Sequence, residues 1–470
     1  MATETVESSV GFRSERGPIL GALMLATALV ALDSTIIATA VLTITSNLGG
    51  FNQFPWLFSI YLLAQAVTVP VYGKLADTVG RKPVILFGIA VFALGSLLCG
   101  LATSMLGLIV FRAVQGIGAG AIQPMTMTIA GDLYTLSERA KVQGYLASVW
   151  AMSSVLGPLL GGVFAEYVNW RWIFLVNLPL SALAAWMLLR SFAESTPRRK
   201  QRVDYLGAAL LTVGAGALIL GLLEGGQAWA WSAPASIAIF AGGALVLALF
   251  ALVERRAENP ILPLWIFTRR VIVASSLVSL LVGAILLGMT SYVPTFTQGV
   301  LGTGALVAGL TVGALTLGWP LAASQAGKVY LRIGFRFTAL IGSTLATLGA
   351  ASTLLIDENS TLIQVAASCF VIGIGMGLVA TPTLIAAQTS AEWTERGVVT
   401  STNMFARSIG SAVGVAVFGA IVNARIGDTD HPAPATLSSA VHLVFVTVAV
   451  MALVMVVASA MMPSRGTNPA

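Results

Sequence analysis

Long apolar stretches follow one another along the whole chain, separated by short polar segments. A helix that crosses a membrane needs about 20 mostly apolar residues. Only 9% of the residues are charged, against about 25% in a typical soluble domain. The sequence therefore predicts an all-α membrane protein with fourteen spans, at roughly 19–44, 56–75, 83–103, 106–130, 142–165, 172–192, 205–225, 233–253, 272–296, 303–326, 336–356, 361–386, 398–422 and 437–461.

The basic residues predict the orientation of these spans. An even number of spans places both termini on one side of the membrane. If that side is the cytoplasm, 21 of the 25 Lys and Arg residues are cytoplasmic, whereas Arg171 and Arg425 are outside and Arg112 and Arg407 lie within spans. Because cytoplasmic loops of membrane proteins are rich in Lys and Arg, we expect both termini in the cytoplasm of a cell with the chain in its inner (plasma) membrane. The polar first 18 residues and the length of the first apolar run argue against a cleavable signal peptide.

The sequence offers no pattern typical of an enzyme, a metal site or a nucleotide-driven pump. Cys99 and Cys369 both lie inside apolar runs, and His431 and His442 match no metal-ligand spacing. No Gly-x4-Gly-Lys-[Ser/Thr] loop and no constellation of nucleophile, base and orienting group occurs. The net charge of +6 lies in the loops. We therefore expect no catalytic residue, cofactor, metal or nucleic-acid partner.

One acid interrupts the first apolar run. Asp33 has apolar sequence on both sides, and a charge at such a depth costs at least ~2.5–3.5 kcal/mol. An intramembrane acid is expected to face other helices or a water-filled cavity and to have a partner. Asp33 is predicted to bind a proton or a cation; the alternative is a structural acid paired permanently with a buried Arg.

Arg112 is the predicted partner of Asp33. Asp33 lies ~21 Å from the cytoplasmic end of its span, and Arg112 lies ~9 Å below the outer end of the fourth span. In a hydrocarbon core of ~30 Å these depths coincide. One face of the fourth span carries small and polar residues: Arg112, Gln115, Gly116, Ala119 and Gln123. We expect the polar ones, Gln123 among them, to line a cavity; Gly116 and Gly120 suit close helix packing.

The loop between the second and third spans reads Gly73-Lys-Leu-Ala-Asp-Thr-Val-Gly-Arg-Lys-Pro83. Gly80 and Pro83 could simply end one helix and begin the next, with the basic residues fixing topology. The pattern of Gly73, Asp77, Gly80, Arg81 and Lys82 nevertheless resembles the signature loop of the major facilitator superfamily. That resemblance implies that Asp77 and Arg81 form a charge cluster that latches the outward-facing state.

Asp132, near Arg139 at the cytoplasmic end of the fourth span, is expected to join this charge cluster.

Four further segments resemble motifs of the same superfamily. Gly157-Pro158-x-x-Gly161-Gly162 on the fifth span is similar to the motif of its antiporters, although a kinked packing helix would explain it too. Arg112-Ala-Val-Gln-Gly-x-Gly matches the family's fourth-span motif. Leu32-Asp-Ser-Thr-Ile-Ile and the segment from Trp170 to Pro179 resemble marks of its fourteen-span drug:proton antiporters.

The resemblance implies a major facilitator fold of two six-helix bundles plus two additional central helices. We predict a cytoplasmic tail at 1–18, an N-terminal bundle at 19–193, a linker with the two added helices at 194–271, a C-terminal bundle at 272–462 and a tail at 463–470. The residue pattern of Gly73–Arg81 recurs from Gly327 to Arg336, with Leu331 at the position of Asp77. This internal repeat supports two related halves. The second latch is therefore expected to be degenerate.

Arg407 is the second basic residue inside a span, and the second-half spans contain no acid to pair with it. A carbonyl, a phospholipid or an anionic group of a substrate could meet it. We interpret it as a packing or gating residue.

The sequence and the resemblance together predict a monomeric, proton-coupled antiporter that exports lipophilic, often cationic drugs by alternating access, and thus a role in multidrug efflux and antibiotic resistance. Its partners would be protons, the small-molecule substrate and membrane lipids. An exporter of an endogenous lipid, siderophore or metabolite is the alternative on the same fold. A channel or passive scaffold is more remote, because one Asp and a two-fold repeat supply no ring of like residues around a pore.

Overall fold

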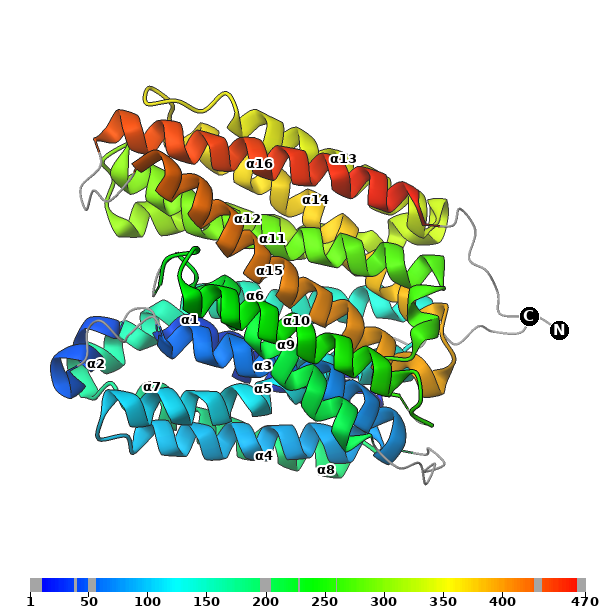
Figure 1. Ribbon diagram of the computed structural model, residues 1–470. Coiled ribbons are helices and arrows are strands. Elements are labelled where there is room, and N and C mark those ends of the chain that lie inside the picture. Colours follow the sequence, from blue (N-terminus) through cyan, green and yellow to red (C-terminus); the bar gives the residue numbers. More distant parts are fainter. Residues whose placement is uncertain are drawn as a thin grey trace.

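The computed structural model describes residues 11–37, 40–49, 56–194, 204–226, 229–258, 260–426 and 433–462 (Figure 1). These residues are almost entirely helical, and the strand-type pairing among them is limited to one isolated bridge between Gly225 and Trp229. An all-helical chain satisfies its backbone groups within each segment, which a bilayer demands of any spanning structure.

The first half forms a bundle, called here the N-terminal bundle. Its helices are α1 (Gly17–Ile36), α2 (Val41–Leu48), α3 (Trp56–Val79), α4 (Arg81–Gly100), α5 (Met105–Leu133), α6 (Leu136–Val163) with the π-helix η3 (Phe164–Val168), α7 (Trp172–Leu175) and α8 (Asn177–Ser191). The added pair is α9 (Tyr205–Glu224) and α10 (Pro234–Glu254), followed by the 3-10 turn η4 (Leu264–Phe267).

The second half forms the C-terminal bundle. Its elements are α11 (Arg270–Gly299), α12 (Ala305–Ile333), α13 (Phe335–Thr353), α14 (Leu362–Thr389), the 3-10 turn η5 (Trp393–Glu395), α15 (Arg396–Ile426) and α16 (Pro434–Ala460). Proline is tolerated inside α3, α5, α11, α12 and α14, as is common in membrane helices whose neighbours satisfy the freed backbone groups.

The predicted spans correspond to helices of the structure. Thirteen described helices are long and apolar enough to cross a membrane. The remaining predicted span, 336–356, coincides with α13, which is 19 residues long and carries several Ser and Thr. The predicted first span was too long, because α1 ends at Ile36 and α2 begins at Val41. Three successive β-branched residues, Thr35–Ile37, weaken helix propensity at this break.

Each bundle has its own apolar core, and small residues let its helices touch. A Cβ atom on Gly118 of α5 would lie 2.3 Å from the backbone nitrogen of Phe92 on α4. In the other bundle, a Cβ on Gly375 of α14 would lie 2.4 Å from the nitrogen of Ala346 on α13. Such close backbone approach supplies the packing that holds membrane helices together, because lipid gives no hydrophobic drive between them.

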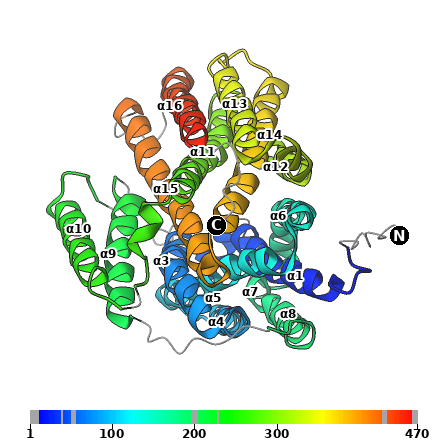
Figure 2. The same cartoon turned by 90° about the vertical axis from the view of Figure 1, so that its right-hand side faces the viewer.

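Helix α9 lies outside the two bundles and contacts both of them. Leu211, Ala215 and Ile219 of α9 share one buried apolar cluster with Val67 of α3 and Phe405 of α15. Figure 2 shows α9 beside α3 and α15, with α10 farther out. The added pair is therefore peripheral to the interface between the bundles.

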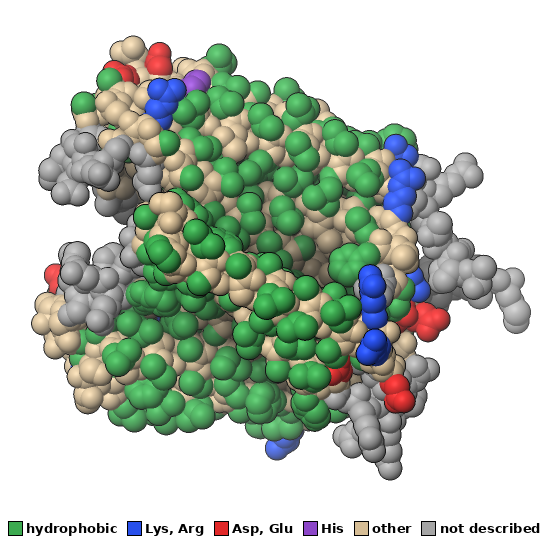
Figure 3. All heavy atoms as spheres, viewed as in Figure 1, with side chains coloured by type: hydrophobic (Ala, Val, Ile, Leu, Met, Phe, Trp, Pro, Cys, Tyr) green, Lys and Arg blue, Asp and Glu red, His purple; other side chains and the backbone are tan. Residues whose placement is uncertain are grey.

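All hydrogen bonds between the bundles, among the described residues, gather at one end of the molecule. Tyr330 on α12 donates to the carbonyl of Leu136 over 2.6 Å. The amide of Gln388 on α14 donates to the carbonyl of Met127 over 3.3 Å. Figure 3 shows Lys and Arg side chains along this end and an indentation between the bundles at the opposite end. The end that carries the basic residues, the predicted cytoplasmic end, is closed.

The glycine contacts yield a prediction about stability. Ala at Gly118 should lower the melting temperature, since overpacking against backbone costs about 1–3 kcal/mol. Ala at Gly309 of α12 is the matched control: it brings the same gain in helix propensity, but nothing lies within 4 Å of its added Cβ. Thermal unfolding of the two purified variants in detergent measures the difference. Equal melting temperatures would contradict tight packing of α4 on α5.

Candidate functional site

Asp33 on α1 meets two side chains of α5 inside the N-terminal bundle. Arg112 Nη1 lies 2.5 Å from Asp33 Oδ2, and Gln115 Nε2 donates to Asp33 Oδ1 over 2.7 Å. Arg112 Nη1 also donates to Gln115 Oε1 over 2.7 Å. Because Arg112 and Gln115 are three residues apart on a helix, they share one face and reach the same carboxylate. The two charges thus neutralise each other within the bundle.

Two further polar side chains complete this cluster from other helices. Asn177 Nδ2 at the start of α8 donates to Asp33 Oδ1 over 3.2 Å. Ser96 Oγ on α4 accepts from Gln115 Nε2 over 2.7 Å. The Asp33 carboxylate therefore accepts hydrogen bonds from three residues, which offset part of the cost of burying its charge.

The guanidinium of Arg112 is also enclosed. Its Nε donates to the carbonyl of Leu57 over 3.1 Å, and the group lies 4.1 Å from the centre of the Tyr61 ring. Side chains of this cluster are at most 2% exposed. The hydroxyl of Tyr61 is buried with no hydrogen-bond partner among the described residues. Arg112 and Gln115 were expected to line a cavity; here they are fully buried instead.

Gln123 does not belong to this cluster, although it shares a face of α5 with Gln115. Its Oε1 accepts from Gln65 Nε2 of α3 over 3.2 Å. Gly116 and Gly120 lie against α3, where added Cβ atoms would approach Tyr61 O at 2.5 Å and Thr68 Oγ1 at 2.1 Å. The packing expected at these two glycines is present, and it positions α5 against α3.

A second charge cluster lies at the closed end, where the basic residues gather. Arg81 at the start of α4 pairs with Asp77 of α3 over 2.9 Å and with Asp132 of α5 over 3.2 Å. Asp132 also pairs with Arg396, the first residue of α15, over 3.1 Å. Arg81 is 2% exposed, so its charge requires these partners. The cluster joins three helices of one bundle to one helix of the other.

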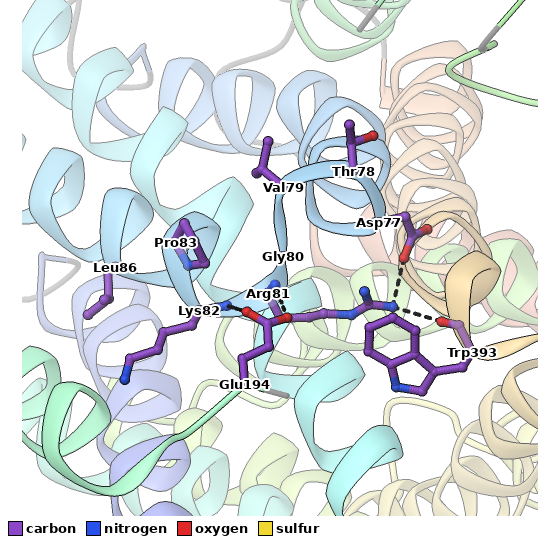
Figure 4. A pocket seen from close by; sticks show the side chains of 10 residues that line it. All are labelled: Asp77, Thr78, Val79, Gly80, Arg81, Lys82, Pro83, Leu86, Glu194 and Trp393. Carbon is purple, nitrogen blue, oxygen red and sulfur yellow. Dashed lines mark hydrogen bonds and ion pairs between the residues drawn. The ribbon is translucent and has the colours of Figure 1, made fainter. Parts of the chain in front are cut away.

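Asp77 binds the N-terminus of α15 directly. Its two carboxylate oxygens accept from the backbone nitrogens of Gly397 over 3.1 Å and Val398 over 2.8 Å. The first amides of a helix have no partner within it, and the helix dipole favours a negative charge there. Arg81 Nη2 donates to Trp393 O over 2.8 Å and its guanidinium lies 3.7 Å from the Trp393 ring centre (Figure 4).

Glu194 completes the cluster from the end of the first bundle. Its carboxylate accepts from the backbone nitrogens of Arg81 over 2.7 Å and Lys82 over 3.0 Å, at the N-terminus of α4. Gly80 precedes them with φ of 106°, a conformation that favours glycine. Lys82 Nζ donates to the carbonyls of Leu189 and Phe192. These groups line a pocket of about 440 Å³.

The remaining predicted latch residues lie close by. A Cβ on Gly73 would lie 1.9 Å from Ser401 Oγ of α15, so only glycine permits this contact. Arg139 makes no ion pair with Asp132 among the described residues. It donates to the carbonyls of Tyr134 and Gly131 instead, and burial together with nearby Arg396 lowers its pKa.

The second-half counterpart of this loop lacks the acid. Gly334 repeats the positive φ of Gly80, at 85°, but Leu331 is 51% exposed, whereas the side chain of Asp77 in the first half is only 6% exposed.

The Gly157–Gly162 segment packs α6 against α1. A Cβ on Gly157 would lie 2.0 Å from Thr35 Oγ1, and that hydroxyl donates to Ser153 O over 2.9 Å. Gly161 is buried, and nothing lies within 4 Å of a Cβ on Gly162. The side chain of Pro158 lies outside the described residues. Thr35 is two positions from Asp33, so this contact ties the acid's helix to α6.

Comparison with known proteins identifies the family. The family model of the Major Facilitator Superfamily matches residues 23–415. The chain belongs to the major facilitator superfamily. It is 34% identical to "Multidrug transporter protein MdtP" of Bacillus subtilis, over 91% of this chain and 79% of that protein. It is 35% identical to "Multidrug resistance protein 3" of the same organism, over 86% of this chain and 78% of that protein.

A solved structure shares the fold. The human organic anion transporter MFSD10 (TETRAN) superposes with a TM-score of 0.68 at 15% identity, covering 95% of this chain and 99% of that one. The family and the spanning helices make this chain a multi-pass membrane transporter of small molecules.

Several residues of the Asp33 cluster and of the Arg81 cluster were not predicted from the sequence. Asn177 lies in a segment that carries a subfamily resemblance, and its polar side chain at the edge of an apolar run was the available signal. Ser96, Glu194 and Trp393 gave no such signal, because each contacts its partners only through residues that are distant in the sequence.

Arg407 lies deep in α15, makes no hydrogen bond or ion pair through its side chain among the described residues, and keeps part of its surface accessible.

The latch generates a second prediction. Asn at Asp77 should loosen the closed end, because charge-assisted hydrogen bonds to α15 are lost; a loss of about 1.5 kcal/mol opens it about tenfold more often. A cysteine in place of Ser401, which is 0% exposed, reports opening through its rate of maleimide labelling. Native Cys99 and Cys369 are buried and give little background.

The matched control for this experiment is Asn at Leu331, the corresponding second-half position, which should leave the labelling rate unchanged. Equal rates in the Asp77 and Leu331 variants would show that Asp77 does not hold this end closed.

Proposed function

We propose that this protein is a proton-coupled antiporter that exports lipophilic small molecules by alternating access, with Asp33 as the proton-binding group. The observation that carries the proposal is the buried Asp33–Arg112 pair inside the N-terminal bundle. Relatives named as multidrug transporters support export as the direction. The wider proposal includes both termini in the cytoplasm and a single chain as the working unit.

Protonation of Asp33 provides the switch. A neutral carboxyl no longer attracts Arg112 as an anion does, and the oxygen that carries the proton becomes a donor where it formerly only accepted hydrogen bonds. In the present arrangement Asp33 is 1% exposed, so proton exchange requires α1 to move relative to α5. A carboxylate that exchanges protons only in one arrangement of the helices couples the proton to that arrangement.

A contact path leads from Asp33 to the interface between the bundles. Thr35 of α1 fits against Gly157 of α6, and farther along α6 a Cβ on Gly144 would meet Ser324 of α12 at 3.1 Å. A shift of α1 is thereby passed through α6 to the C-terminal bundle. The latch of Asp77 and Arg81 holds the cytoplasmic end closed until this shift occurs.

The driving force is sufficient for efflux. One proton that moves inward through 100 mV releases ~2.3 kcal/mol, which supports an outward concentration gradient on the order of 50-fold. Because the latched state is closed at the cytoplasmic end, substrate leaves it toward the outside.

Transport in inside-out vesicles tests this function. With an inward-acidic pH gradient, wild type should accumulate a lipophilic dye, whereas the Asp33→Asn variant should lose gradient-driven uptake. It should keep dye exchange between the two sides, because the substrate site is intact. Asp357→Asn, on a loop beyond the spans, is the matched control and should behave as wild type. Full gradient-driven transport by a folded Asp33→Asn variant would overturn the proposal.

A further inference from the structure

Arg407 carries a charge inside the C-terminal bundle that no described residue neutralises. Its side chain makes no hydrogen bond and no ion pair among these residues, although Arg407 lies midway along α15 and is only partly accessible. Charged side chains within a membrane are normally paired, since an isolated charge there is costly. The other intramembrane cation, Arg112, has Asp33. Arg407 therefore calls for an anion from elsewhere.

The face of α15 that carries Arg407 lies along α11 and α14 of its own bundle, and α14 in turn contacts the opposite bundle. Thr400 and Ser411 share this face, seven residues before and four after Arg407. Thr400 Oγ1 accepts from Gln388 of α14 over 3.0 Å, and Gln388 also bonds to Met127 of α5. Ser411 donates to Gly283 O of α11 over 3.2 Å. Figure 2 places α15 at the middle of the molecule, where the bundles meet.

Arg407 lies beyond the cytoplasmic closure. It is ~10 Å along α15 from Thr400, toward the outer end. Gln388, Thr400 and Met127 seal the space below it, while Arg407 itself keeps part of its surface accessible. A molecule that entered between the bundles would meet this guanidinium before it met the seal.

The backbone of α15 at Arg407 is held in place, and α15 itself carries no acidic residue. A Cβ on Gly283 of α11 would lie 2.1 Å from Arg407 O, and one on Gly410 would lie 1.8 Å from Leu280 O. This tight contact holds α15 on α11. Glu395, at the cytoplasmic end, is ~18 Å away along the helix. Asp33 is occupied by Arg112, Gln115 and Asn177.

We propose that Arg407 binds the anionic group of the transported molecule, so that the substrate is an amphipathic anion that carries a carboxylate, sulfonate or phosphate. The transport step rests on the proposed function, whereas the binding step does not. With Asp33 neutralised by Arg112, the field in the space that Arg407 faces is positive and repels cations.

An anionic group of this kind has two sources: a free amphiphile or the phosphate of an anionic lipid. Both would place oxygen atoms against a guanidinium, which binds carboxylate and phosphate through paired hydrogen bonds. The experiment separates them by the lipid that surrounds the protein.

Two xanthene dyes of similar shape and opposite charge serve as probes: fluorescein, an anion, and rhodamine 6G, a cation. Binding is measured by fluorescence anisotropy to the full chain in phosphatidylcholine nanodiscs. The variants are Arg407→Gln and Arg407→Lys. Arg425→Gln, at the exposed outer end of the same helix, is the matched control.

The expected result is that wild type and the Arg425 variant prefer fluorescein, that Arg407→Gln weakens fluorescein binding about tenfold or more, and that Arg407→Lys lies between. Rhodamine 6G binding should not weaken in either Arg407 variant, which shows that the protein is folded. Unchanged fluorescein binding in Arg407→Gln, equal loss of both dyes, or no preference in wild type overturns the inference. If Arg407→Gln fails to fold, unchanged fluorescein binding in Arg407→Lys overturns it.

Adding phosphatidylglycerol to the nanodisc distinguishes a free amphiphile from an anionic lipid as the source of the anionic group. If it suppresses fluorescein binding to wild type more strongly than the residual binding to Arg407→Gln, a lipid headgroup occupies the site; equal suppression or none assigns the site to a free amphiphile. Because none of these readouts uses a proton gradient, loss of coupling in the Asp33 experiment and loss of anion binding here are separate outcomes.

Discussion

The ion pair of Asp33 and Arg112 is the interaction on which the N-terminal bundle depends. Two opposite charges within an apolar bundle are stable only when their remaining hydrogen-bonding groups also have partners. If one partner is missing, the desolvation cost of the buried charge is no longer compensated. Gln115, Asn177 and Ser96 supply those partners from three helices. Helices α1, α4, α5 and α8 are thereby held in one relative position. A change of protonation at Asp33 therefore acts on the whole bundle and not on one side chain.

The contacts between the bundles are of a different kind. Within each bundle, glycines bring backbones together over long stretches, and apolar cores fill the space. Between the bundles, the polar contacts are few and lie at one end, with Asp77 on the first amides of α15 as the central element. Helix-terminal amides and carboxylates can be rehydrated when they separate, so the interface opens at modest cost. The chain thus consists of two closely packed bundles, and the polar contacts between them are few, lie at one end and can separate.

Much of this architecture could be predicted from the sequence, for identifiable reasons. Span length and the distribution of Lys and Arg predict the fourteen helices, and helix rise alone places Asp33 and Arg112 at one depth. Sequence reasoning failed where neighbouring helices decide the outcome. Gln123 shares a face of α5 with Gln115, yet it bonds to Gln65 because α3 covers that end of the face. Glu194 and Trp393 reach Arg81 from segments more than 100 residues away, which no local pattern records.

The position of α9 bears on how a lipophilic molecule could enter. Where α3 and α15 approach each other, Leu211, Ala215 and Ile219 of α9 share a buried cluster with both, so acyl chains are excluded from that flank. The seam between α6 and α12, on the far side in Figure 2, has no such cover among the described helices. The added pair therefore covers one of the two lateral interfaces between the bundles and leaves the other uncovered. Any exchange with the bilayer is thereby directed toward a single side of the molecule.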